Sequence, residues 1–407
     1  MRCGLLGKKL GHSYSPQIHS HLGRYSYELF EKAPEELEDF LRNGDFIGLN
    51  VTMPYKKDVL PYCSELSERA SQLGAVNTIV RRADGSLIGH NTDYFGFQSM
   101  VERSGIQVSG KKVLILGTGG ASVTAVAVLK QLGAEVIVIS RSGENNYKNL
   151  PIHSDASIIV NATPVGMYPN TGNSPVDLNL FPQLEGVLDI VYNPARTQLL
   201  LDAEARGLIT ENGLWMLVAQ AKESAEWFTH TKISDNKIAM IHSLLRCQME
   251  NLVLIGMPGC GKSTLGRVAA NVLNKEFVDA DEEIVRLAGM TVPEIFAQSG
   301  ESGFRSIETK VLQELGKRSG LVIATGGGCV TQTVNYNLLH QNGRIVWIQR
   351  DINTLSTEGR PLSQANKLED MYAIRKPMYE SFSDSCVSND GDVESVVKKI
   401  LTLEGYA

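Results

Sequence analysis

Short runs of valine, isoleucine and leucine alternate with amphipathic segments of helical period along almost the whole chain. Examples of these apolar runs, each predicted to form a buried strand, lie at 112–116, 135–139, 158–160, 187–191, 251–255, 321–324 and 344–348. Strands that alternate with helices in this way are typical of parallel sheets. We therefore expect an α/β fold with parallel sheets.

Two glycine-rich turns, each between a predicted strand and a predicted helix, organise this pattern. One begins at Gly117 and is followed by a helix over 123–131, and the other begins at Gly256. The turns lie too far apart in the sequence to share one nucleotide, so they predict two nucleotide sites. A helix predicted over 233–249 leads up to the second turn, and the main domain boundary is therefore expected near 247–250.

With this boundary, we expect one domain over 1–248 and another over 249–407. The first should divide into a substrate lobe over about 1–100 and a dinucleotide lobe over about 101–213, with 214–248 returning to close the cleft. A chain of 407 residues is too long for one ordinary hydrophobic core, because domains typically run to roughly 100–200 residues.

Composition and charge exclude several classes of protein. A net charge of -6 argues against a general nucleic-acid binder, which would have a basic face. No apolar run approaches the ~20 residues of a membrane span, and the first residues read as a strand rather than a signal peptide. The six cysteines are dispersed and form no CxxC pair. Together these features predict a cytoplasmic protein with free thiols and no structural metal.

The first glycine-rich turn, Gly117-Thr118-Gly119-Gly120-Ala121-Ser122, has features of a dinucleotide-binding loop. Its first glycine permits a tight turn, and its second lets the backbone approach a pyrophosphate at a helix N-terminus. Ser122 stands where a third glycine usually lies, so a purely structural turn stays open. The next strand ends in Ser140-Arg141-Ser142 rather than in an acid. An arginine suits a 2′-phosphate, so NADP is favoured, with a solvated arginine as the alternative.

Polar clusters lie in the lobe before this turn. Ser15 is placed to cap a helix that has Pro16 at its first position, which leaves Ser13 unexplained. A lysine pair, Lys56 and Lys57, follows the strand end at Asn50-Val51-Thr52. Two further segments, Gly74-Ala75-Val76-Asn77-Thr78 and Gly89-His90-Asn91-Thr92-Asp93, place amides and a carboxylate at strand ends. Substrates of open α/β sheets bind at such ends.

In their order and spacing these segments resemble shikimate dehydrogenase over about the first 245 residues. The likeness also includes His12-Ser13-Tyr14-Ser15-Pro16, Asn161-Ala162-Thr163 and residues 216–221. The resemblance implies that Lys56 pairs with Asp93 as the acid and base beside the substrate. It implies that Ser13 and Ser15 bind the substrate carboxylate with help from Tyr192. The substrate's ring hydroxyls are assigned, again by the resemblance, to Thr52, Asn77 and Gln220.

The same resemblance implies a set of cofactor-binding residues along the turn and the later strand ends: Gly117, Thr118, Gly119, Gly120, Ala121, Ser140, Arg141, Thr163 and Gly213. One departure bears on the cofactor. Members that use NADP usually carry a second basic residue shortly after Arg141, where this chain has Gly143-Glu144-Asn145. A single cation is left for the phosphate, so use of NAD or of both cofactors stays open.

The second turn, Gly256-Met257-Pro258-Gly259-Cys260-Gly261-Lys262-Ser263-Thr264, matches the P-loop pattern G-x-x-x-x-G-K-S between a strand and a helix. Such a loop cradles phosphates on its backbone N–H groups, here those of 259–264. Its lysine, Lys262, reaches the β- and γ-phosphates and Ser263 binds Mg²⁺. The pattern predicts an ATP site.

Polar and glycine-rich motifs follow the P-loop: Phe277-Val278-Asp279-Ala280-Asp281, Gly303-Phe304-Arg305, Ala324-Thr325-Gly326-Gly327-Gly328, Arg360-Pro361-Leu362 and Arg375. Together they resemble shikimate kinase over essentially all of 249–407. The resemblance implies that Asp279 holds Mg²⁺ and that Asp281 meets the hydroxyl being phosphorylated, with Lys262 also catalytic. Arg305 and Arg375 would hold the substrate carboxylate, and Arg360 would be the lid cation over the transferred phosphoryl group. The backbone of Gly326, Gly327 and Gly328 would pack against the substrate ring. The lid segment at 351–359 looks short and lacks an arginine that members often carry near the adenine.

The sequence therefore predicts a fusion of two enzymes. An α/β substrate lobe and a Rossmann-type NAD(P) lobe would reduce 3-dehydroshikimate to shikimate. A P-loop α/β domain with a parallel sheet would then phosphorylate shikimate with ATP and Mg²⁺. The partners expected are small molecules, with no nucleic acid and no membrane. Two alternatives stay open: a quinate/shikimate dehydrogenase that uses NAD, fused to the kinase, or one half kept as a non-catalytic module.

Overall fold

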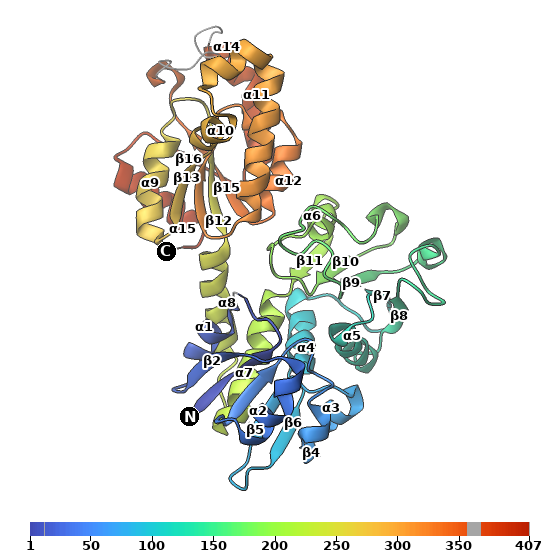
Figure 1. The fold of residues 1–407 in the computed structure, drawn as a ribbon. Coiled ribbons are helices and arrows are strands. Elements are labelled where there is room, and N and C mark those ends of the chain that lie inside the picture. Colours follow the sequence, from blue (N-terminus) through green and yellow to red (C-terminus); the bar gives the residue numbers. More distant parts are fainter. Residues whose placement is uncertain (12, 356–367, 407) are drawn as a thin grey trace. The chain divides into compact units, whose positions relative to one another are not determined.

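The computed structural model describes residues 1–11, 13–355 and 368–406 (Figure 1). Spatial clustering divides the chain into two compact units. The first comprises Met1–Gly166, Asn173–Tyr192 and Asp202–Leu244, and the second comprises Met167–Gly172, Asn193–Leu201 and Leu245–Ala407. No helix in the described ranges is long and apolar enough to cross a membrane. Each unit is treated separately below.

The first sheet of the first unit has the strand order β2-β1-β3-β5-β6-β4 in the described chain. Its strands are β1 (Arg2–Gly7), β2 (Ser26–Glu31), β3 (Gly48–Val51), β4 (Glu65–Leu66), β5 (Thr78–Arg81) and β6 (Leu87–His90). β1 runs parallel to β2 and β3, whereas β5 runs antiparallel to both β3 and β6. The pattern typical of parallel sheets therefore does not hold for the pairing of β5 with its two neighbours. The tight turn between β5 and β6, in which Gly85 has φ +85°, replaces the crossover helix that parallel strands need.

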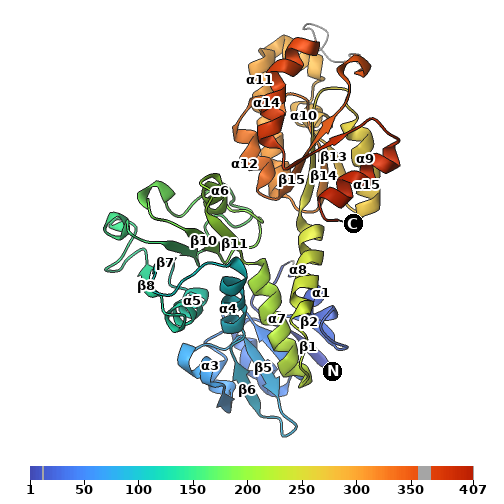
Figure 2. The same cartoon turned by 180° about the vertical axis from the view of Figure 1, so that it is seen from behind.

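Helices pack around this mixed sheet: α1 (Ser15–Ser20), α2 (Leu37–Asn43), α3 (Glu68–Leu73), α4 (Asp93–Ser104), α7 (Leu214–Thr229) and α8 (Asn236–Met249). Helices α4 and α7 run side by side in Figures 1 and 2. They can approach closely because Gly96 has no side chain. A Cβ atom there would lie 2.8 Å from the Met216 carbonyl oxygen. This packing brings the start of α4 next to the middle of α7, where the predicted substrate residues lie.

The start of α1 corrects one local prediction. The helix begins at Ser15 itself and its N-cap is Tyr14, which makes no side-chain capping bond. The Ser15 N–H instead donates to the Ser13 hydroxyl at 3.2 Å. Pro16 lies in the first turn as expected, but because Tyr14 already has helical backbone angles, the cap position falls one residue earlier than predicted.

The second sheet of this unit is parallel, with the described order β11-β10-β9-β7-β8. Its strands are β7 (Lys112–Leu116), β8 (Glu135–Ile139), β9 (Ile158–Asn161), β10 (Gly186–Asp189) and β11 (Ile209–Asn212), with helices α5 (Gly120–Gln131) and α6 (Gln198–Ala205). Apolar residues of α4, α5, β7 and β9 share one core. The predicted strand over 187–191 ends early because the Val191 N–H turns back to the Asp189 carboxylate at 3.0 Å.

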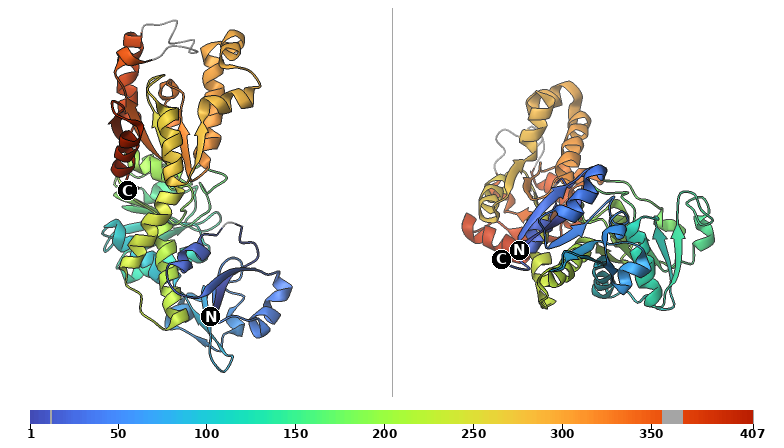
Figure 3. Two further views of the ribbon diagram at one scale, coloured as in Figure 1. Left: turned by 90° about the vertical axis from the view of Figure 1, so that its left-hand side faces the viewer. Right: turned by 60° about the horizontal axis from the view of Figure 1, so that its bottom comes forward.

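The second unit has a parallel sheet of described order β13-β14-β12-β15-β16. Its strands are β12 (Asn251–Ile255), β13 (Glu276–Asp279), β14 (Leu321–Ala324), β15 (Gly343–Gln349) and β16 (Ser385–Ser388). Its helices are α9 (Lys262–Leu273), α10 (Ala280–Ala288), α11 (Val292–Lys317), α12 (Val334–His340), α14 (Leu368–Phe382) and α15 (Val393–Leu403). Helices α9 and α15 cover one face of the sheet and α11 and α12 the other, as Figures 2 and 3 show. The P-loop therefore opens at the carboxyl edge of a sheet that is covered on both faces.

Short 3₁₀ helices complete the described elements: η1 (Pro34–Glu36), η2 (Leu60–Tyr62), η3 (Leu150–His153), η4 (Leu178–Leu180), η5 (Cys329–Thr331) and η6 (Ile352–Thr354). Of these, η5 matters for function because it follows directly on the glycine run at 326–328. That run connects β14 to η5 at the same sheet edge as the P-loop. The glycines therefore lie where a ligand of this sheet would bind.

Candidate active sites

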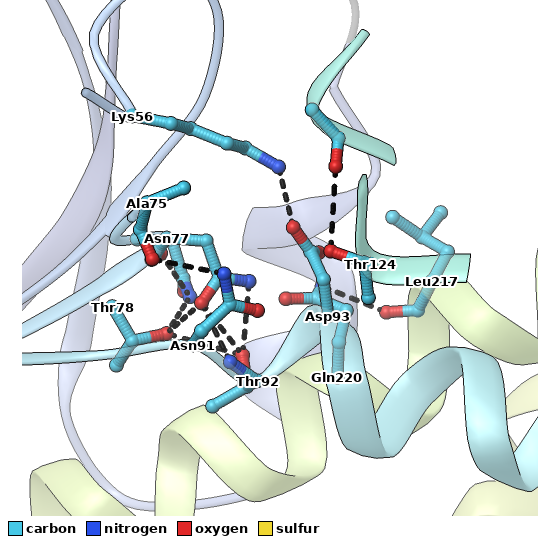
Figure 4. A network of polar contacts seen from close by, with 12 residues as sticks. Lys56, Ala75, Asn77, Thr78, Asn91, Thr92, Asp93, Thr124, Leu217 and Gln220 are labelled. Carbon is cyan, nitrogen blue, oxygen red and sulfur yellow. Dashed lines mark hydrogen bonds and ion pairs between the residues drawn. The ribbon is translucent and has the colours of Figure 1, made fainter. Parts of the chain in front are cut away.

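A lysine–carboxylate pair lies at the carboxyl end of β3. The Lys56 ammonium is 2.5 Å from a carboxylate oxygen of Asp93, as Figure 4 shows. Lys56 stands in the loop after β3, and Asp93 is the first residue of α4, where the helix dipole favours a negative charge. The Lys56 side chain is 23% exposed and that of Asp93 is 12% exposed. The structure thus forms the predicted pair and leaves the ammonium accessible to a small ligand.

Asn77 is held beside this pair by the residue that precedes Asp93. Its side-chain oxygen accepts the Thr92 N–H at 2.7 Å, and its amide nitrogen donates to the Thr92 hydroxyl at 3.1 Å (Figure 4). The neighbouring Asn91 donates to the Ala75 carbonyl at 3.0 Å. These bonds tie the loop before β5 to the start of α4. Asn77 and Asp93 therefore face the same space although sixteen positions separate them.

Two further predicted substrate residues approach from other elements. Gln220 comes from α7 and lies beside Asp93 in Figure 4, with its amide donating to the Leu217 carbonyl at 2.9 Å. Thr52 follows β3 directly and its N–H donates to the Leu6 carbonyl at 2.9 Å. The side chains of both are half-buried. They add a neutral amide and a hydroxyl near the charged pair.

The predicted carboxylate-binding group consists of Ser13, Ser15 and Tyr192. The rings of Tyr14 and Tyr192 meet edge to face, with centroids 6.3 Å apart, which brings the segment after β10 to the start of α1. Burial raises the pKa of Tyr192, so its phenol stays protonated and can donate a hydrogen bond. Three hydroxyl groups near one helix start suit a carboxylate. His12 of the same motif lies outside the described residues.

The first glycine-rich turn has the geometry of a phosphate loop. Gly117 has φ +107°, and a Cβ atom there would lie 2.9 Å from a methyl carbon of Thr163. Gly119 is the N-cap of α5, so the helix N-terminus opens over Gly120 and Ala121. Ser122, which replaces the usual third glycine, is buried and donates to the Gly117 carbonyl at 2.7 Å. Its hydroxyl closes the turn from within and leaves Thr118 and the helix start for a ligand.

The strand ends beside this turn carry the other predicted cofactor residues. Arg141 is exposed just after β8, and the Ser140 N–H donates to the Asn145 carbonyl at 3.1 Å, which folds the 140–146 segment into a turn. The Thr163 hydroxyl donates to the Asn161 side-chain oxygen at 2.7 Å. Gly213 must lack a side chain, because a Cβ atom would lie 1.9 Å from the Ile190 carbonyl oxygen. These positions border the carboxyl edge of the second sheet.

The P-loop of the second unit borders a cavity of about 590 Å³. Gly256, Gly259 and Gly261 all have positive φ, and Gly261 is the N-cap of α9. The buried Lys262 ammonium donates to the carbonyls of Gly256 at 2.9 Å and Met257 at 3.1 Å. Cys260 is also buried, with its sulfur 3.8 Å from the ammonium. Its N–H donates to the Met257 carbonyl at 3.2 Å.

The residues predicted to hold a metal ion lie together at this cavity. The Ser263 hydroxyl donates to an Asp279 carboxylate oxygen at 2.6 Å. The other Asp279 oxygen accepts the Asp281 N–H at 3.0 Å and so caps α10. A hydroxyl and a carboxylate are the hard oxygen ligands that Mg²⁺ prefers, and one or two protein ligands are usual at phosphate sites. These two residues therefore fit Mg²⁺ bound together with a nucleotide.

Arg305 and the glycine run form the opposite wall of the cavity. Arg305 donates to Glu308 at 2.7 Å and to Glu301 at 3.1 Å. A Cβ atom at Gly328 would lie 2.0 Å from a guanidinium nitrogen of Arg305. A Cβ atom at Gly326 would lie 2.8 Å from oxygens of both Asp281 and Glu308. Only glycines leave room for these charged groups.

Arg375 of α14 completes the wall. Its guanidinium donates to the Gly327 carbonyl at 3.3 Å, and the Tyr379 hydroxyl donates to the same oxygen. The cavity lining includes Thr264, Asp281, Arg305 and Arg375. The remaining predicted cation, Arg360, lies outside the described residues, as do 356–359 of the predicted lid segment.

Two charged residues that line this cavity were not among the sequence predictions. Glu308 is fully buried and pairs with Arg305. Burial raises the pKa of Glu308, with Arg305 opposing this rise. Glu308 could have been predicted from the sequence, because a glutamate three positions after an arginine lies on the same face of a helix. Arg350, which also lines the cavity, follows β15 without any motif around it.

Two segments of the chain match the family models of two different enzymes. Residues 5–79 match the family model of the shikimate dehydrogenase substrate binding domain, and residues 258–403 match the family model of shikimate kinase. A shikimate dehydrogenase (NADP(+)) of Caldicellulosiruptor bescii is 38% identical over 264 residues, which cover 57% of this chain and 91% of that protein.

Solved structures are similar over the same part of the chain. Shikimate dehydrogenase 1 from Peptoclostridium difficile is 38% identical with a TM-score of 0.56, covering 60% of this chain and 97% of its own. The shikimate 5-dehydrogenase of Thermus thermophilus, solved in complex with NADP(H) and shikimate, is 31% identical with a TM-score of 0.55, and the match covers 60% of this chain and 98% of that one.

Proposed function

The chain belongs to the shikimate dehydrogenase family and continues into a shikimate kinase domain, and from this premise we propose how its residues carry out two successive reactions. It is a bifunctional enzyme of the shikimate pathway, an NADP-dependent oxidoreductase and an ATP-dependent phosphotransferase. The first reaction converts 3-dehydroshikimate to shikimate, and the second converts shikimate to shikimate 3-phosphate. One observation carries the proposal: Lys56 lies 2.5 Å from Asp93, while Asp281, Arg305 and Arg375 line a separate P-loop cavity.

In the first reaction Lys56 is the proton donor. Bound NADPH would supply the hydride to the carbonyl carbon of the substrate, and the oxygen that becomes a hydroxyl needs a proton. The Lys56 ammonium gives that proton, and takes it back in the reverse direction. Asp93 holds the ammonium in place and accepts a hydrogen bond from a neighbouring substrate hydroxyl. Because the Lys56 side chain is 23% exposed, solvent can return the proton after each turnover.

The remaining residues of the first site orient the substrate. Ser13, Ser15 and Tyr192 donate hydrogen bonds to its carboxylate. Thr52, Asn77 and Gln220 contact its ring hydroxyls. A polyhydroxylated ring needs such a set, because a substrate analogue that lacks one hydroxyl leaves a buried protein group unpaired.

In the second reaction Asp281 receives the proton of the substrate hydroxyl that attacks. ATP would supply the transferred phosphoryl group and Mg²⁺ would neutralise its charge, with Ser263 and Asp279 as the metal ligands. Lys262 leaves the two P-loop carbonyls and binds the phosphate oxygens on which negative charge develops. Arg305 and Arg375 bind the substrate carboxylate, and the glycine run at 326–328 packs against its ring. Positioning and charge neutralisation are the main requirements of phosphoryl transfer.

For the cofactor of the first reaction, we propose that Arg141 and Ser140 bind the 2′-phosphate of NADP while the 117–121 turn binds the pyrophosphate. Arg141 is exposed at the end of β8, where a ribose phosphate would arrive. We also propose a cytoplasmic location, since all six cysteines are free, as is usual in a reducing compartment.

A coupled assay tests both halves of the proposal. The full chain, given 3-dehydroshikimate, NADPH, ATP and Mg²⁺, should form shikimate 3-phosphate. In the Lys56→Ala variant the dehydrogenase turnover number should fall by roughly 10²–10⁴-fold, the range that acid/base catalysis contributes. The variant should still phosphorylate added shikimate at the wild-type rate. The Asp281→Asn variant should do the reverse and accumulate shikimate. A Lys56→Ala variant with normal turnover and only a raised KM would show that Lys56 is not the proton donor.

A further inference from the structure

Ser224 lies on α7, one turn after Gln220, and is fully buried. Its hydroxyl oxygen is 2.9 Å from the Gln220 carbonyl and 2.7 Å from the amide nitrogen of Asn50. It is also 2.9 Å from the hydroxyls of both Thr78 and Thr92. One serine thus joins helix α7 to the end of β3, the start of β5 and the N-cap of α4. These are the elements that carry the predicted substrate residues.

We propose that Ser224 is a positioning residue of the dehydrogenase site, which holds the Asn77 amide in place through Thr78 and Thr92. The inference rests on the proposed function and deepens it, because it names the residue that decides how one substrate contact is presented. Ser224 itself does not touch the substrate. It affects the binding of the substrate's ring hydroxyls and does not affect the binding of the cofactor.

The direction of each hydrogen bond follows from what each group can donate or accept. The Tyr27 hydroxyl donates to the Asn50 side-chain oxygen at 2.7 Å, which fixes the Asn50 amide so that its nitrogen faces Ser224. An amide nitrogen can only donate and a backbone carbonyl can only accept. Ser224 therefore accepts from Asn50 and gives its one proton to the Gln220 carbonyl. One lone pair is left, and it accepts the hydroxyl proton of either Thr78 or Thr92.

The consequence reaches Asn77. When Ser224 accepts the hydrogen bond of one threonine hydroxyl, the other threonine hydroxyl can donate to the Asn77 side-chain oxygen, 3.1 Å from Thr78 and 3.2 Å from Thr92, or to the first threonine hydroxyl at 3.1 Å. The Asn77 oxygen also accepts the Thr92 N–H at 2.7 Å, and because an N–H can only donate, this oxygen faces the protein. The Asn77 amide nitrogen donates one hydrogen to Thr92 and can direct its other hydrogen at the substrate. Asn77 thus presents a donor, next to the acceptor Asp93.

Removing the Ser224 hydroxyl redistributes these protons. In Ser224→Ala, Asn50 has only the Thr78 hydroxyl and the Asn77 carbonyl as acceptors, at 3.2 Å and 3.5 Å. The Thr78 hydroxyl then accepts from Asn50, and neither threonine has a serine to donate to. The Thr92 N–H still holds the Asn77 oxygen, but Thr78 and Thr92 are no longer tied to α7, so the Asn77 amide is held less firmly against the substrate hydroxyl.

The test is a steady-state comparison of single and double variants in the full chain. We expect Ser224→Ala to raise KM for shikimate roughly tenfold, a loss of about the size of one buried hydrogen bond. The turnover number should change less than threefold, and KM for NADP and the kinase rate should not change. If Ser224 acts through Asn77, its effect on kcat/KM should disappear in an Asn77→Ala background. Effects that multiply in the double variant, or an unchanged KM for shikimate, would overturn the proposal.

A matched control separates this role from a general loss of stability. The Thr229 hydroxyl makes the same kind of bond on the same helix, to the Ala225 carbonyl at 2.8 Å. Thr229→Val should therefore leave KM for shikimate unchanged. If Ser224→Ala does not fold, Thr78→Val removes the next hydroxyl of the network and should give the same split between KM and kcat, and a normal KM there would also refute the proposal. Wild-type oxidation of shikimate tests the proposed function separately.

Discussion

Lys56 and Lys262 show how the partner of a side chain selects its chemistry. The Lys56 ammonium is held by one carboxylate, Asp93, at 2.5 Å, so its charge is balanced and its other protons face the ligand space. The Lys262 ammonium is held by two neutral backbone carbonyls, at 2.9 Å and 3.1 Å. It keeps an unbalanced positive charge, which phosphate oxygens bind more strongly than carbonyls do. The first lysine is suited to proton transfer and the second to binding phosphate.

Arg141 gives the residue-scale test of cofactor choice. We expect Arg141→Ala to raise KM for NADP roughly tenfold, because a charge-assisted contact to the 2′-phosphate is lost. KM for NAD should stay the same, since NAD has no such phosphate. The exposed Arg42, which pairs with Glu38 on α2, provides a control whose replacement by alanine should affect neither cofactor. An equal rise in KM for both cofactors would mean that Arg141 supports the turn and does not read the phosphate.

Single residues mark the limit of what the sequence could predict. The Lys56–Asp93 pair was predicted from a family resemblance, and its geometry follows from two strand ends that meet at one sheet edge. Ser224 could not be found in this way, because its partners at positions 50, 78 and 92 are brought together only by the packing of α7 against the mixed sheet. The predicted cap at Ser15 was wrong by one position, since the backbone angles of Tyr14 decide where α1 begins.

At the scale of elements, the connection from β14 to η5 determines whether Arg305 can enter the kinase cavity. A Cβ atom at Gly328 would lie 2.0 Å from its guanidinium, so Gly328→Ala should displace Arg305. We expect KM for shikimate in the kinase reaction to rise at least tenfold, while KM for ATP and the dehydrogenase rate stay unchanged. Gly391→Ala is the matched control, because the nearest atom to its Cβ would be 3.8 Å away. A normal KM in Gly328→Ala would show that Arg305 does not bind the substrate.

The contact between α3 and α7 should make stability depend on pH. Burial raises the pKa of Glu223 on α7 to about 7, although Arg69 of α3 opposes this rise from 3.7 Å away. A carboxyl whose pKa is raised in the folded state stabilises the fold below its unfolded value of 4.5, and this contribution is lost as the pH rises through about 7.

Glu223→Gln removes this titration. The free energy of unfolding of the first unit should fall by about 1–3 kcal/mol more in the wild type than in the variant between pH 5 and pH 8. Urea unfolding, followed through the fluorescence of Trp215 and Trp227, measures the difference, with Trp347 of the second unit replaced by phenylalanine in both proteins. Parallel pH profiles for the two proteins would show that Glu223 titrates normally.

The elements also show why strand direction was harder to predict than strand position. The runs at 112–116, 251–255 and 321–324 coincide with β7, β12 and β14, because a strand buried on both faces leaves a continuous apolar run. The run at 135–139 coincides with β8, an edge strand that is only partly buried. Strands β5 and β6 are nearly as buried, so their apolar runs look similar. Their antiparallel pairing depends on a tight turn rather than on burial, and a hydrophobic pattern does not report it.

Across the whole molecule, the two sets of reacting groups use separate stretches of sequence. The proposed dehydrogenase residues fall between Ser13 and Gln220, and the described kinase residues between Gly259 and Arg375. The first reaction makes the acceptor of the second, so the fusion joins consecutive steps. A tether, however, raises the local concentration only of groups attached to it, and a small product is free to diffuse.

The chain should therefore work when it is divided. We expect two separately produced pieces, mixed at equal concentration, to form shikimate 3-phosphate at nearly the rate of the fused chain. The boundary predicted from the sequence falls after residue 248, but contacts within the second unit favour an earlier cut. The longest segment of that unit begins at Leu245. Within it, Arg246 pairs with the buried Glu250 at 3.1 Å, and the Cys247 thiol donates to the Gly405 carbonyl at 3.5 Å.

A kinase piece that starts at residue 245 keeps these contacts, whereas a piece that starts at 249 leaves Glu250 with Arg344, at 3.1 Å, but without Arg246. Removing Arg246 leaves the charge of the buried Glu250 carboxylate only partly balanced, which is destabilising. The longer piece should therefore unfold at a higher temperature, while both pieces have the same kcat. The segments Met167–Gly172 and Asn193–Leu201, which cluster with the second unit, stay with the dehydrogenase piece. If neither kinase piece is active until the dehydrogenase piece is added, the second unit depends on those segments and the halves are not independent enzymes.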